Sequence, residues 1–468
     1  MHNLYYVYTY GDSMKVYAKR AWLSTGWQND VCVSIRDGII STIESGIQPA
    51  PDAVRVDTLL PALANLHSHS FQRAMAGMTE FRAKGQDSFW TWRDLMYRFL
   101  DHLTPEQMQA IAALTYMEML EAGYAAVGEF HYVHHQNGGA RYDNPAETST
   151  RIMAAADLTG IGLTHLPVLY TYGGANKVTL AGGQLRFGNS TQDYATLVEC
   201  IHSEAKALPD DTRIGIAPHS LRATAPDELT AICTAYPNAP THIHISEQPA
   251  EVRDISAWLG ARPVEWLLHN QNVTTNWCLI HATHMTKGET VNLAKSGAVA
   301  GLCPITEANL GDGPFNGALY LAENGAFGLG SDSNVRISLT EELRMLEYSQ
   351  RLRDLQRNVM VKDAGSVGKT LYLGAVAGGA QALDRNAGEI RAGQLADIVA
   401  INSQHPHLCS LTPDQIFDGL CFASDDSVVT DTWSAGRHMV QDGHHINKET
   451  IIANYQVAIS QLKTSIAT

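Results

Sequence analysis

The feature that most constrains the fold is a series of eight short apolar segments within residues 59–385, each ending in polar residues. The segments are LLPALANLHSH, YAAVGEFHY, GIGLTHLPVLY, RIGIAPHS, THIHIS, WCLIHATH, AVAGLCP and AFGLGSD. Short apolar runs of this kind are typical of strands buried on both faces of a parallel sheet. Helical segments separate them, and this repeated alternation predicts an α/β fold, a (β/α)8 barrel of the TIM type. A doubly wound open sheet is the alternative, but the sequence has no GxGxxG or P-loop motif to support it.

The clearest helix signal lies in TPEQMQAIAALTYMEMLEAGY. Thr104 is a good N-cap residue, Pro105 suits the first helical position, and Gln107 completes a capping box. Gly123 stands where a glycine commonly ends a helix. The sequence therefore predicts a helix that begins at 105 and ends shortly before Gly123.

The two ends of the chain have a different pattern. VCVSIRDGIISTIE alternates apolar and polar residues around Asp37-Gly38, which predicts a hairpin. GEIRAGQLADIVAIN and TWSAGRHMVQDGHH have a similar strand and turn character. We expect residues 1–58 and 386–468, the latter with a terminal helix, to form one small β-sandwich domain, and residues 59–385 to form the barrel.

Charge and cysteine content narrow the class of partner. The chain has 33 basic and 48 acidic residues, a net charge of −15, which disfavours broad nucleic-acid binding. Its seven cysteines include no CxxC pair, which favours reduced thiols and a cytoplasmic protein. The first residues lack the features of a signal peptide, and no run of eighteen apolar residues occurs. We expect no membrane association and a small-molecule substrate.

Polar residues at the ends of the apolar segments are of the types that bind metals. His67 and His69 end the first segment, and side chains at i and i+2 of a strand share a face. The fifth segment likewise carries His242 and His244, with Glu247 just beyond it. Each pattern alone has an ordinary explanation: hydrogen-bonded histidines near the surface, or a glutamate at the start of a helix.

Two further segments complete the pattern. His281 ends the sixth segment, and Asp332 follows the eighth, where an isolated Asp after Gly-Ser is usually a turn residue. Catalytic groups of a (β/α)8 barrel lie at the carboxyl ends of its strands. Chance agreement of all these positions with the strand ends is improbable, so together they predict a metal site.

Other histidines are interpreted as structural. His131 and His165 are expected in the core or at its rim with hydrogen-bond partners. Exposed positions are expected for His134, His135, His444 and His445.

With HxH, HxxE, His and Asp in this order, the chain resembles the amidohydrolase superfamily over nearly its whole length. GEIRAGQLADIVAIN is similar to the segment that those proteins use in their composite β domain. The HxxE motif resembles the branch that contains adenosine, cytosine and guanine deaminases, which implies one metal ion and no carboxylated lysine. The fourth segment ends in His219, with no lysine there, in agreement with that expectation.

A narrower resemblance rests on NLHSHSFQRAMAGMTE, TWRDLMY, GEFHYVHH, APHSLRA and HIHISEQPAEV. These motifs are similar to those of the formimidoylglutamate deiminases, enzymes of bacterial histidine degradation. The resemblance implies a cytoplasmic, homodimeric hydrolase that converts N-formimidoyl-L-glutamate and water to N-formyl-L-glutamate and ammonia.

The resemblance also implies roles for individual residues. One divalent ion, with zinc expected and iron chemically possible, would bind to His67, His69, His244 and Asp332. Asp332 and His281 would take the proton of the attacking water, and protonated Glu247 would donate to the imino nitrogen. The substrate-binding residues would be Gln72, Arg93, Tyr132, His219 and Arg222. An ordinary structural ion pair is the alternative role for either arginine.

Three alternatives remain open at this point. The first is another deaminase of the same superfamily that acts on a purine, pterin or triazine ring, which would need aromatic stacking in place of the arginines. The second is a non-catalytic relative, which the complete set of ligands and acid disfavours. The third is an amidinohydrolase that releases urea, whose carboxylate-rich pattern for two metals is not evident in this sequence.

Overall fold

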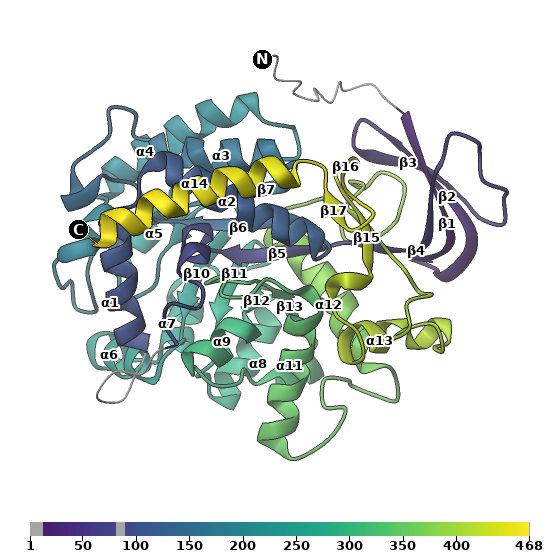
Figure 1. Cartoon of the computed structure of the whole chain (residues 1–468). Coiled ribbons are helices and arrows are strands. Elements are labelled where there is room, and N and C mark those ends of the chain that lie inside the picture. Colours follow the sequence, from purple (N-terminus) through teal and green to yellow (C-terminus); the bar gives the residue numbers. More distant parts are fainter. Residues whose placement is uncertain (1–12, 81–88, 468) are drawn as a thin grey trace, which may run out of the picture.

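The computed structural model describes residues 13–80 and 89–467, and its central feature is a sheet of parallel strands that curls into a ring. Figure 1 shows these strands among the helices that surround them. The strands are β5 (Leu63–Ser68), β6 (Tyr124–His131), β7 (Gly162–Leu169), β8 (Arg213–Ile214), β9 (Ala217–Pro218), β10 (Thr241–Ile245), β11 (Trp277–His281), β12 (Val299–Leu302) and β13 (Ala326–Leu329). The short strands β8 and β9 both pair with β7 and occupy one position of the ring. Bridges from Ile216 to Thr241 and from Ser220 to His244 close the ring onto β10. All eight predicted strand segments and the (β/α)8 fold are confirmed.

Helices surround this ring. They are α1 (Phe89–Leu100), α2 (Pro105–Glu121), α3 (Glu147–Thr159), α4 (Thr191–Glu204), α5 (Pro226–Ala235), α6 (Pro249–Leu259), α7 (Pro263–Asn270), α8 (Lys287–Ser296), α9 (Pro304–Leu310), α10 (Gly317–Ala322), α11 (Leu339–Asp354) and α12 (Val367–Ala382). Helix α2 begins as predicted: the Thr104 side chain accepts from the Gln107 backbone, and the Gln107 side chain accepts from the Thr104 backbone. None of the helices within the described residues is long and apolar enough to span a bilayer.

Strands from both chain ends form a second sheet, as expected. They are β1 (Ser13–Leu23), β2 (Gly26–Arg36), β3 (Ile39–Glu44), β4 (Val54–Pro61), β14 (Ile398–Ile401), β15 (Val429–Ser434), β16 (Arg437–Gln441) and β17 (His444–His445). The two ends meet where β14 pairs antiparallel with β4. The strands run as one continuous sheet, and a bridge between Ile39 and Leu395 joins its outer strand β3 to the segment before β14. The curled sheet encloses its own apolar core, which includes Ile40 and Trp433.

The predicted hairpin is present, because β2 and β3 are joined at Asp37 and Gly38. Both residues have positive φ, 51° and 77°, as the common two-residue hairpin turn requires. A β-carbon on Gly38 would lie 2.8 Å from the Ala435 carbonyl oxygen, so another side chain there would also clash. The boundaries at residues 58 and 386 remain a prediction. The last helix, α14 (Lys448–Ala467), leaves the sheet and packs against α2 of the barrel (Figure 1).

A buried ion network joins the second sheet to the barrel. The Arg385 guanidinium lies 3.1 Å from an Asp211 carboxylate oxygen and 2.9 Å from an Asp397 oxygen. Arg437 of β16 contacts Asp211 at 2.8 Å. The charges and hydrogen bonds of both arginines outweigh the effect of burial and lower the pKa of Asp211 well below its usual range. The buried carboxylates of Asp211 and Asp397 are tolerated because each is paired with an arginine.

Several histidines of the barrel and of the second sheet are buried. His131 and His165 contact Thr148 and Ser149 of α3, each at 3.0 Å, so their predicted core positions are confirmed. His134 and His445 are only 1% and 3% exposed, so the prediction of surface positions was wrong for these two. The reason is that their rings bond to the Val168 and Thr159 carbonyl oxygens, which polar composition alone does not indicate. His135 is half-buried, and His444 is exposed.

These buried histidines predict a loss of stability in acid. Burial lowers the pKa of His165 to about 3, so the folded protein resists a proton that the unfolded chain binds below about pH 6.5. Stability is therefore greatest above pH 6.5 and falls as the pH drops towards 3. Between pH 7 and 5.5, each such histidine should cost about 1 kcal/mol. We expect His165→Gln to reduce the pH dependence of urea unfolding by about that amount.

The exposed His202 on α4 provides the matched control. His202→Gln should leave the pH dependence of the unfolding free energy unchanged. An equal pH dependence in wild type and His165→Gln would contradict the proposed effect of burial.

Candidate active site and metal centre

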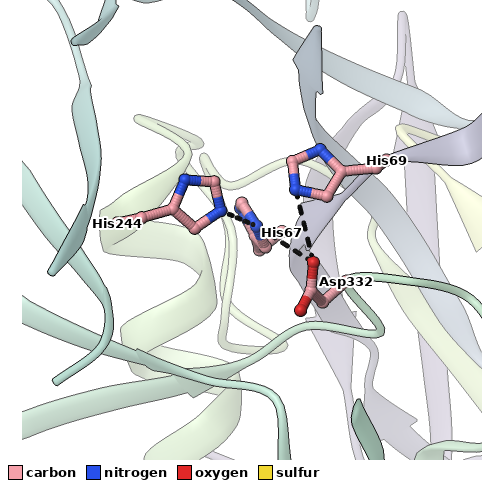
Figure 2. Close-up of side chains that lie close together, drawn as sticks. All are labelled: His67, His69, His244 and Asp332. Atoms are coloured by element: carbon pink, nitrogen blue, oxygen red, sulfur yellow. Dashed lines mark hydrogen bonds and ion pairs between the residues drawn. The ribbon is translucent and has the colours of Figure 1, made fainter. Parts of the chain in front are cut away.

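Four side chains from three strand ends of the barrel converge on one point (Figure 2). His67 and His69 come from the end of β5, His244 from β10, and Asp332 from the segment after β13. One potential ligand atom of each lies within 4.8 Å of those of the others, and all four residues are buried. The His67 and His244 Nε2 atoms are 3.0 Å apart, and Asp332 Oδ1 lies 3.5 Å from His67 Nε2 and 3.3 Å from His69 Nε2.

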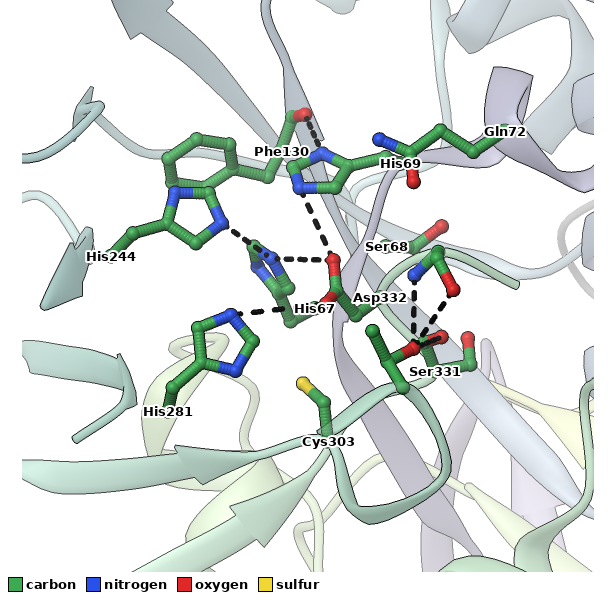
Figure 3. Close-up of polar contacts among 12 residues, drawn as sticks. His67, Ser68, His69, Gln72, Phe130, His244, His281, Cys303, Ser331 and Asp332 are labelled. Atoms are coloured by element: carbon green, nitrogen blue, oxygen red, sulfur yellow. Dashed lines mark hydrogen bonds and ion pairs between the residues drawn. The ribbon is translucent and has the colours of Figure 1, made fainter. Parts of the chain in front are cut away.

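The local backbone holds this arrangement where the barrel closes between β13 and β5. The Asp332 N–H donates to the His67 carbonyl, and the His69 N–H donates to the Asp332 carbonyl, both at 2.9 Å. Asp332 adopts φ = 46°, a left-handed conformation that turns its carboxylate towards the histidines. The Asn334 amide donates to Ser68 Oγ at 3.1 Å and to the Asp332 carbonyl at 3.0 Å. Figure 3 shows Ser68 of β5 beside Ser331 and Asp332 of the segment that follows β13.

Hydrogen bonds orient two of the imidazoles. His69 Nδ1 donates to the Phe130 carbonyl at 2.9 Å, which leaves its Nε2 as the ligand atom (Figure 3). His244 Nδ1 lies 3.2 Å from the His219 carbonyl and donates to it in the same way. Backbone acceptors of this kind fix the tautomer and the ring orientation of histidine ligands. The sequence pattern predicted these imidazoles as ligands but gave no indication of their carbonyl partners.

The donor set fits one divalent metal ion. Two neutral nitrogens bound to one zinc ion at ~2.0–2.1 Å in tetrahedral geometry would lie about 3.3 Å apart, close to the separation of the His67 and His244 Nε2 atoms. Burial lowers the pKa of His67 to about 3, so the ring is neutral, as a ligand must be. Burial raises the pKa of Asp332, but its hydrogen bond with His67 and the charge of His281 outweigh this and lower it well below its usual range, so it is a carboxylate.

His281 and Glu247 lie on the open side of this centre. His281 Nε2 is 3.8 Å from both Glu247 Oε1 and Asp332 Oδ2. Burial raises the pKa of Glu247, although His281 and Arg222 oppose this effect. Burial lowers the pKa of His281, but the surrounding carboxylates, Glu247 above all, outweigh this and raise it to about 10. A divalent cation held by the ligands would oppose that rise electrostatically and favour the neutral imidazole.

Two carboxylates that the sequence analysis missed position these groups. Glu307 on α9 lies 3.3 Å from His281 Nδ1 and also accepts from the Cys303 N–H at 2.9 Å. Glu251 on α6 accepts from the backbone N–H groups of Ser246 and Glu247, each at 3.1 Å. Glu251 follows the predicted strand segment THIHIS, and Glu307 follows AVAGLCP. This position after a strand was the only feature of the sequence that could have indicated a place in the site. Acidic residues near a helix start are too common, however, for position alone to indicate a role.

The remaining predicted site residues surround the same cavity. Its wall includes His69, His244, Glu247, His281 and Asp332 and also the predicted substrate-binding residues Gln72, Arg93, Tyr132, His219 and Arg222. The Gln72 amide donates to the Tyr132 hydroxyl at 2.8 Å. The Arg222 guanidinium lies 4.0 Å from Glu247 and from Glu251, and Arg93 lies over the Tyr97 ring at 5.6 Å. The structure therefore brings every predicted site residue to the wall of this cavity except His67, which converges with His69, His244 and Asp332.

Several other residues of the wall were not predicted. They are Trp92, Met96, Tyr97, Tyr170, Phe187, Leu310 and Ser333. Tyr170 could have been found, because it ends the third apolar segment and so occupies the same kind of position as the histidines. The others lie on helices and loops, where their spacing from the strand ends varies.

Comparison with known proteins identifies relatives over nearly the whole chain. The model of the amidohydrolase family matches residues 58–439, and that of the N-terminal domain of formimidoylglutamate deiminase HutF matches residues 14–56. The formimidoylglutamate deiminase of Pseudomonas aeruginosa is 46% identical over 438 residues, which cover 93% of this chain and 96% of that protein. A 5-methylthioadenosine/S-adenosylhomocysteine deaminase of Shouchella clausii is 26% identical, with 91% and 93% covered.

A solved structure supports the same relationship. The crystal structure of an amidohydrolase from Brucella melitensis superposes with a TM-score of 0.92 and 45% sequence identity, and covers 96% of this chain and 100% of that one. Agreement at this level includes both the barrel and the sheet formed by the two chain ends.

Proposed function

The chain belongs to the amidohydrolase family, and on that premise we propose that it hydrolyses N-formimidoyl-L-glutamate to N-formyl-L-glutamate and ammonia. The observation that carries the proposal is a buried metal-type centre that shares one cavity with an acid, Glu247, and two arginines, Arg93 and Arg222. The metal-type centre and Glu247 suit hydrolysis of a carbon–nitrogen bond, and the two arginines suit a substrate that carries carboxylates. The identity of 46% to a formimidoylglutamate deiminase supports the same substrate.

Zinc is the proposed ion, held by the four residues that converge in Figure 2, namely His67, His69, His244 and Asp332. Three imidazoles and one carboxylate are ligands that zinc accepts readily, and iron is chemically possible. When bound, the ion would polarise water and make a nucleophile available near neutral pH.

Asp332 and His281 would act on the attacking water. Asp332 Oδ2 and His281 Nε2 are 3.8 Å apart, so a single water can contact both and pass its proton to either. The bond between His281 Nδ1 and Glu307 keeps Nε2 directed towards the cavity. A neutral His281 is needed for this step, and the positive charge of a bound ion favours that form.

Glu247 would supply the proton that the leaving nitrogen needs. Its raised pKa keeps the carboxyl group protonated closer to neutral pH than an exposed glutamic acid. Because His281 lies 3.8 Å from it, the proton released by water can be returned to this side of the cavity. Attack at the formimidoyl carbon and protonation of the imino nitrogen would give a tetrahedral carbon that carries a hydroxyl and an amino group. Transfer of the hydroxyl proton to the amino nitrogen through Glu247 would then release ammonia and leave the formyl product.

The glutamate portion would extend away from the ligands towards Arg222 and Arg93. An arginine guanidinium binds a carboxylate through two parallel hydrogen bonds, and two carboxylates can use two arginines. Gln72, Tyr132 and His219 would donate hydrogen bonds between these arginines and the formimidoyl group. This placement would let a protein with a net charge of −15 bind a dianion, since two arginines line the cavity.

Loss of Arg222 should weaken binding of the carboxylates. We expect Arg222→Met to raise KM about 10- to 100-fold, because a hydrogen bond to a charged group is worth ~1.5–3 kcal/mol. The exposed Arg253 on α6 offers the matched control, and Arg253→Met should leave KM unchanged. An unchanged KM in Arg222→Met would remove this residue from the substrate site.

The experiment that tests the function is a substrate panel with zinc-reconstituted protein. Ammonia release would be measured from N-formimidoyl-L-glutamate, 5-methylthioadenosine, a pterin, an aminotriazine and a guanidine. Turnover of formimidoylglutamate with the highest kcat/KM would support the proposal. Preference for a ring substrate would retain the deaminase chemistry and reject the substrate. A role in histidine degradation, a cytoplasmic location and a homodimer are further parts of the proposal, and they rest on the family resemblance of the sequence motifs.

A further inference from the structure

The reaction described above uses no residue from the carboxyl end of β7. Tyr170 immediately follows this strand, lines the cavity and is 5% exposed. Its ring packs against His219 at a centroid distance of 4.5 Å, and His219 in turn lies 4.9 Å from the ligand His244. Tyr170 therefore lies one ring farther from the metal centre than His219, on the side where the substrate would extend.

Gln184 holds the Tyr170 hydroxyl in place. The Gln184 amide nitrogen donates to the Gly173 carbonyl at 3.1 Å and to Tyr170 Oη at 3.4 Å. Its amide oxygen accepts from the Ala181 N–H at 3.2 Å, so both ends of the amide are fixed. A β-carbon on Gly173 would lie 2.6 Å from that oxygen, which indicates how tightly the loop surrounds Gln184.

This arrangement leaves the phenol as a donor. The Tyr170 oxygen accepts from Gln184, and among the side chains that the structure describes none accepts the hydroxyl proton. A buried hydroxyl normally has a partner for its proton, and here the cavity is the open direction. Arg222 lines the same cavity, so an anionic group bound there would meet a cation and a hydroxyl donor together.

We infer that Tyr170 is a specificity-determining residue whose hydroxyl donates to a carboxylate of the substrate, and that Gln184 is the residue that positions it. The inference rests on the proposed function, because it concerns the end of the substrate that does not react. Tyr170 would distinguish amidines that carry carboxylates from those that do not, without contact with the reacting atoms. A purely structural hydroxyl would affect all substrates alike.

The test compares Tyr170→Phe with Tyr172→Phe, both zinc-reconstituted. Tyr172 lies two residues farther along, is half-buried outside the cavity and has Lys177 over its ring at 5.7 Å, so it is a matched control. The substrates are N-formimidoyl-L-glutamate and N-butylformamidine, which has no carboxylate. We expect Tyr170→Phe to raise KM for formimidoylglutamate about 10-fold or more with kcat unchanged, and to leave kcat/KM for butylformamidine unchanged. Tyr172→Phe should resemble wild type with both.

An equal loss with both substrates, or no change with either, would overturn the inference. If wild type does not hydrolyse formimidoylglutamate, the proposed function fails, and calorimetric titration with glutarate then decides the role of Tyr170. Weaker glutarate binding in Tyr170→Phe than in Tyr172→Phe would support a carboxylate contact. Equal affinities would overturn it.

Discussion

Replacing Glu247 by glutamine should lower kcat by about a thousandfold or more while the metal content stays the same, because general acid–base groups typically contribute 10²–10⁴-fold. Glutamine preserves the size of the side chain but cannot supply a proton to the leaving nitrogen. Glu247 is not among the four converging ligands, so the ion should remain bound. The measurement is kcat for ammonia release, together with metal content by elemental analysis.

Glu265 on α7 is exposed and gives a matched control for the Glu247 variant. Glu265→Gln should have wild-type kcat and the same metal content. A Glu247→Gln protein that retains more than about a tenth of wild-type kcat would show that another group supplies the proton.

Removal of a ligand should abolish both metal binding and turnover. We expect His69→Ala to reduce bound zinc from one equivalent to a small fraction, and to lower kcat/KM at least about a thousandfold, since a bound ion contributes several kcal/mol to such hydrolysis. Treatment of wild type with a chelator should have the same effect on activity, and added zinc should restore it. In His69→Ala, added zinc should not restore activity.

His242 provides a demanding control for the ligand variant. It lies on β10 two residues before His244 and is also buried, but its ring bonds to the Ala382 carbonyl at 2.8 Å, outside the group of proposed ligands. His242→Gln should lose some stability and keep one equivalent of zinc. Full zinc occupancy in His69→Ala would contradict the assignment of the centre.

The sequence was sufficient to predict the barrel and the convergence of the four proposed ligands, because both follow from the order of the strand segments. Parallel strands bring their carboxyl ends to one rim, so residues as distant as His67 and Asp332 could be placed together from segment order alone. The same rule missed Tyr170, although it immediately follows β7, because a tyrosine beside a strand end is common in cores and is not a typical metal ligand. A position at a strand end therefore indicated a site residue only where the residue was a typical metal ligand, such as histidine or aspartate.

Other features depend on tertiary contacts that no local pattern contains. His134 was expected at the surface because it is polar. It is buried because its ring forms a hydrogen bond with the Val168 carbonyl on β7, a residue that is distant in the sequence. Glu307 becomes part of the site only because α9 carries it to within 3.3 Å of His281. The fourth strand position is split into β8 and β9 around Gly215, where a β-carbon would lie 2.5 Å from both Leu166 and Pro240.

The most direct test of the account is the identity of the products formed from N-formimidoyl-L-glutamate, followed by proton NMR. The substrate has two carbon–nitrogen bonds at its formimidoyl carbon, and protonation by Glu247 of the imino nitrogen selects one of them. We expect N-formyl-L-glutamate and ammonia in equal amounts. Glutamate and formamide, or no reaction by protein that contains one equivalent of zinc, would contradict the account.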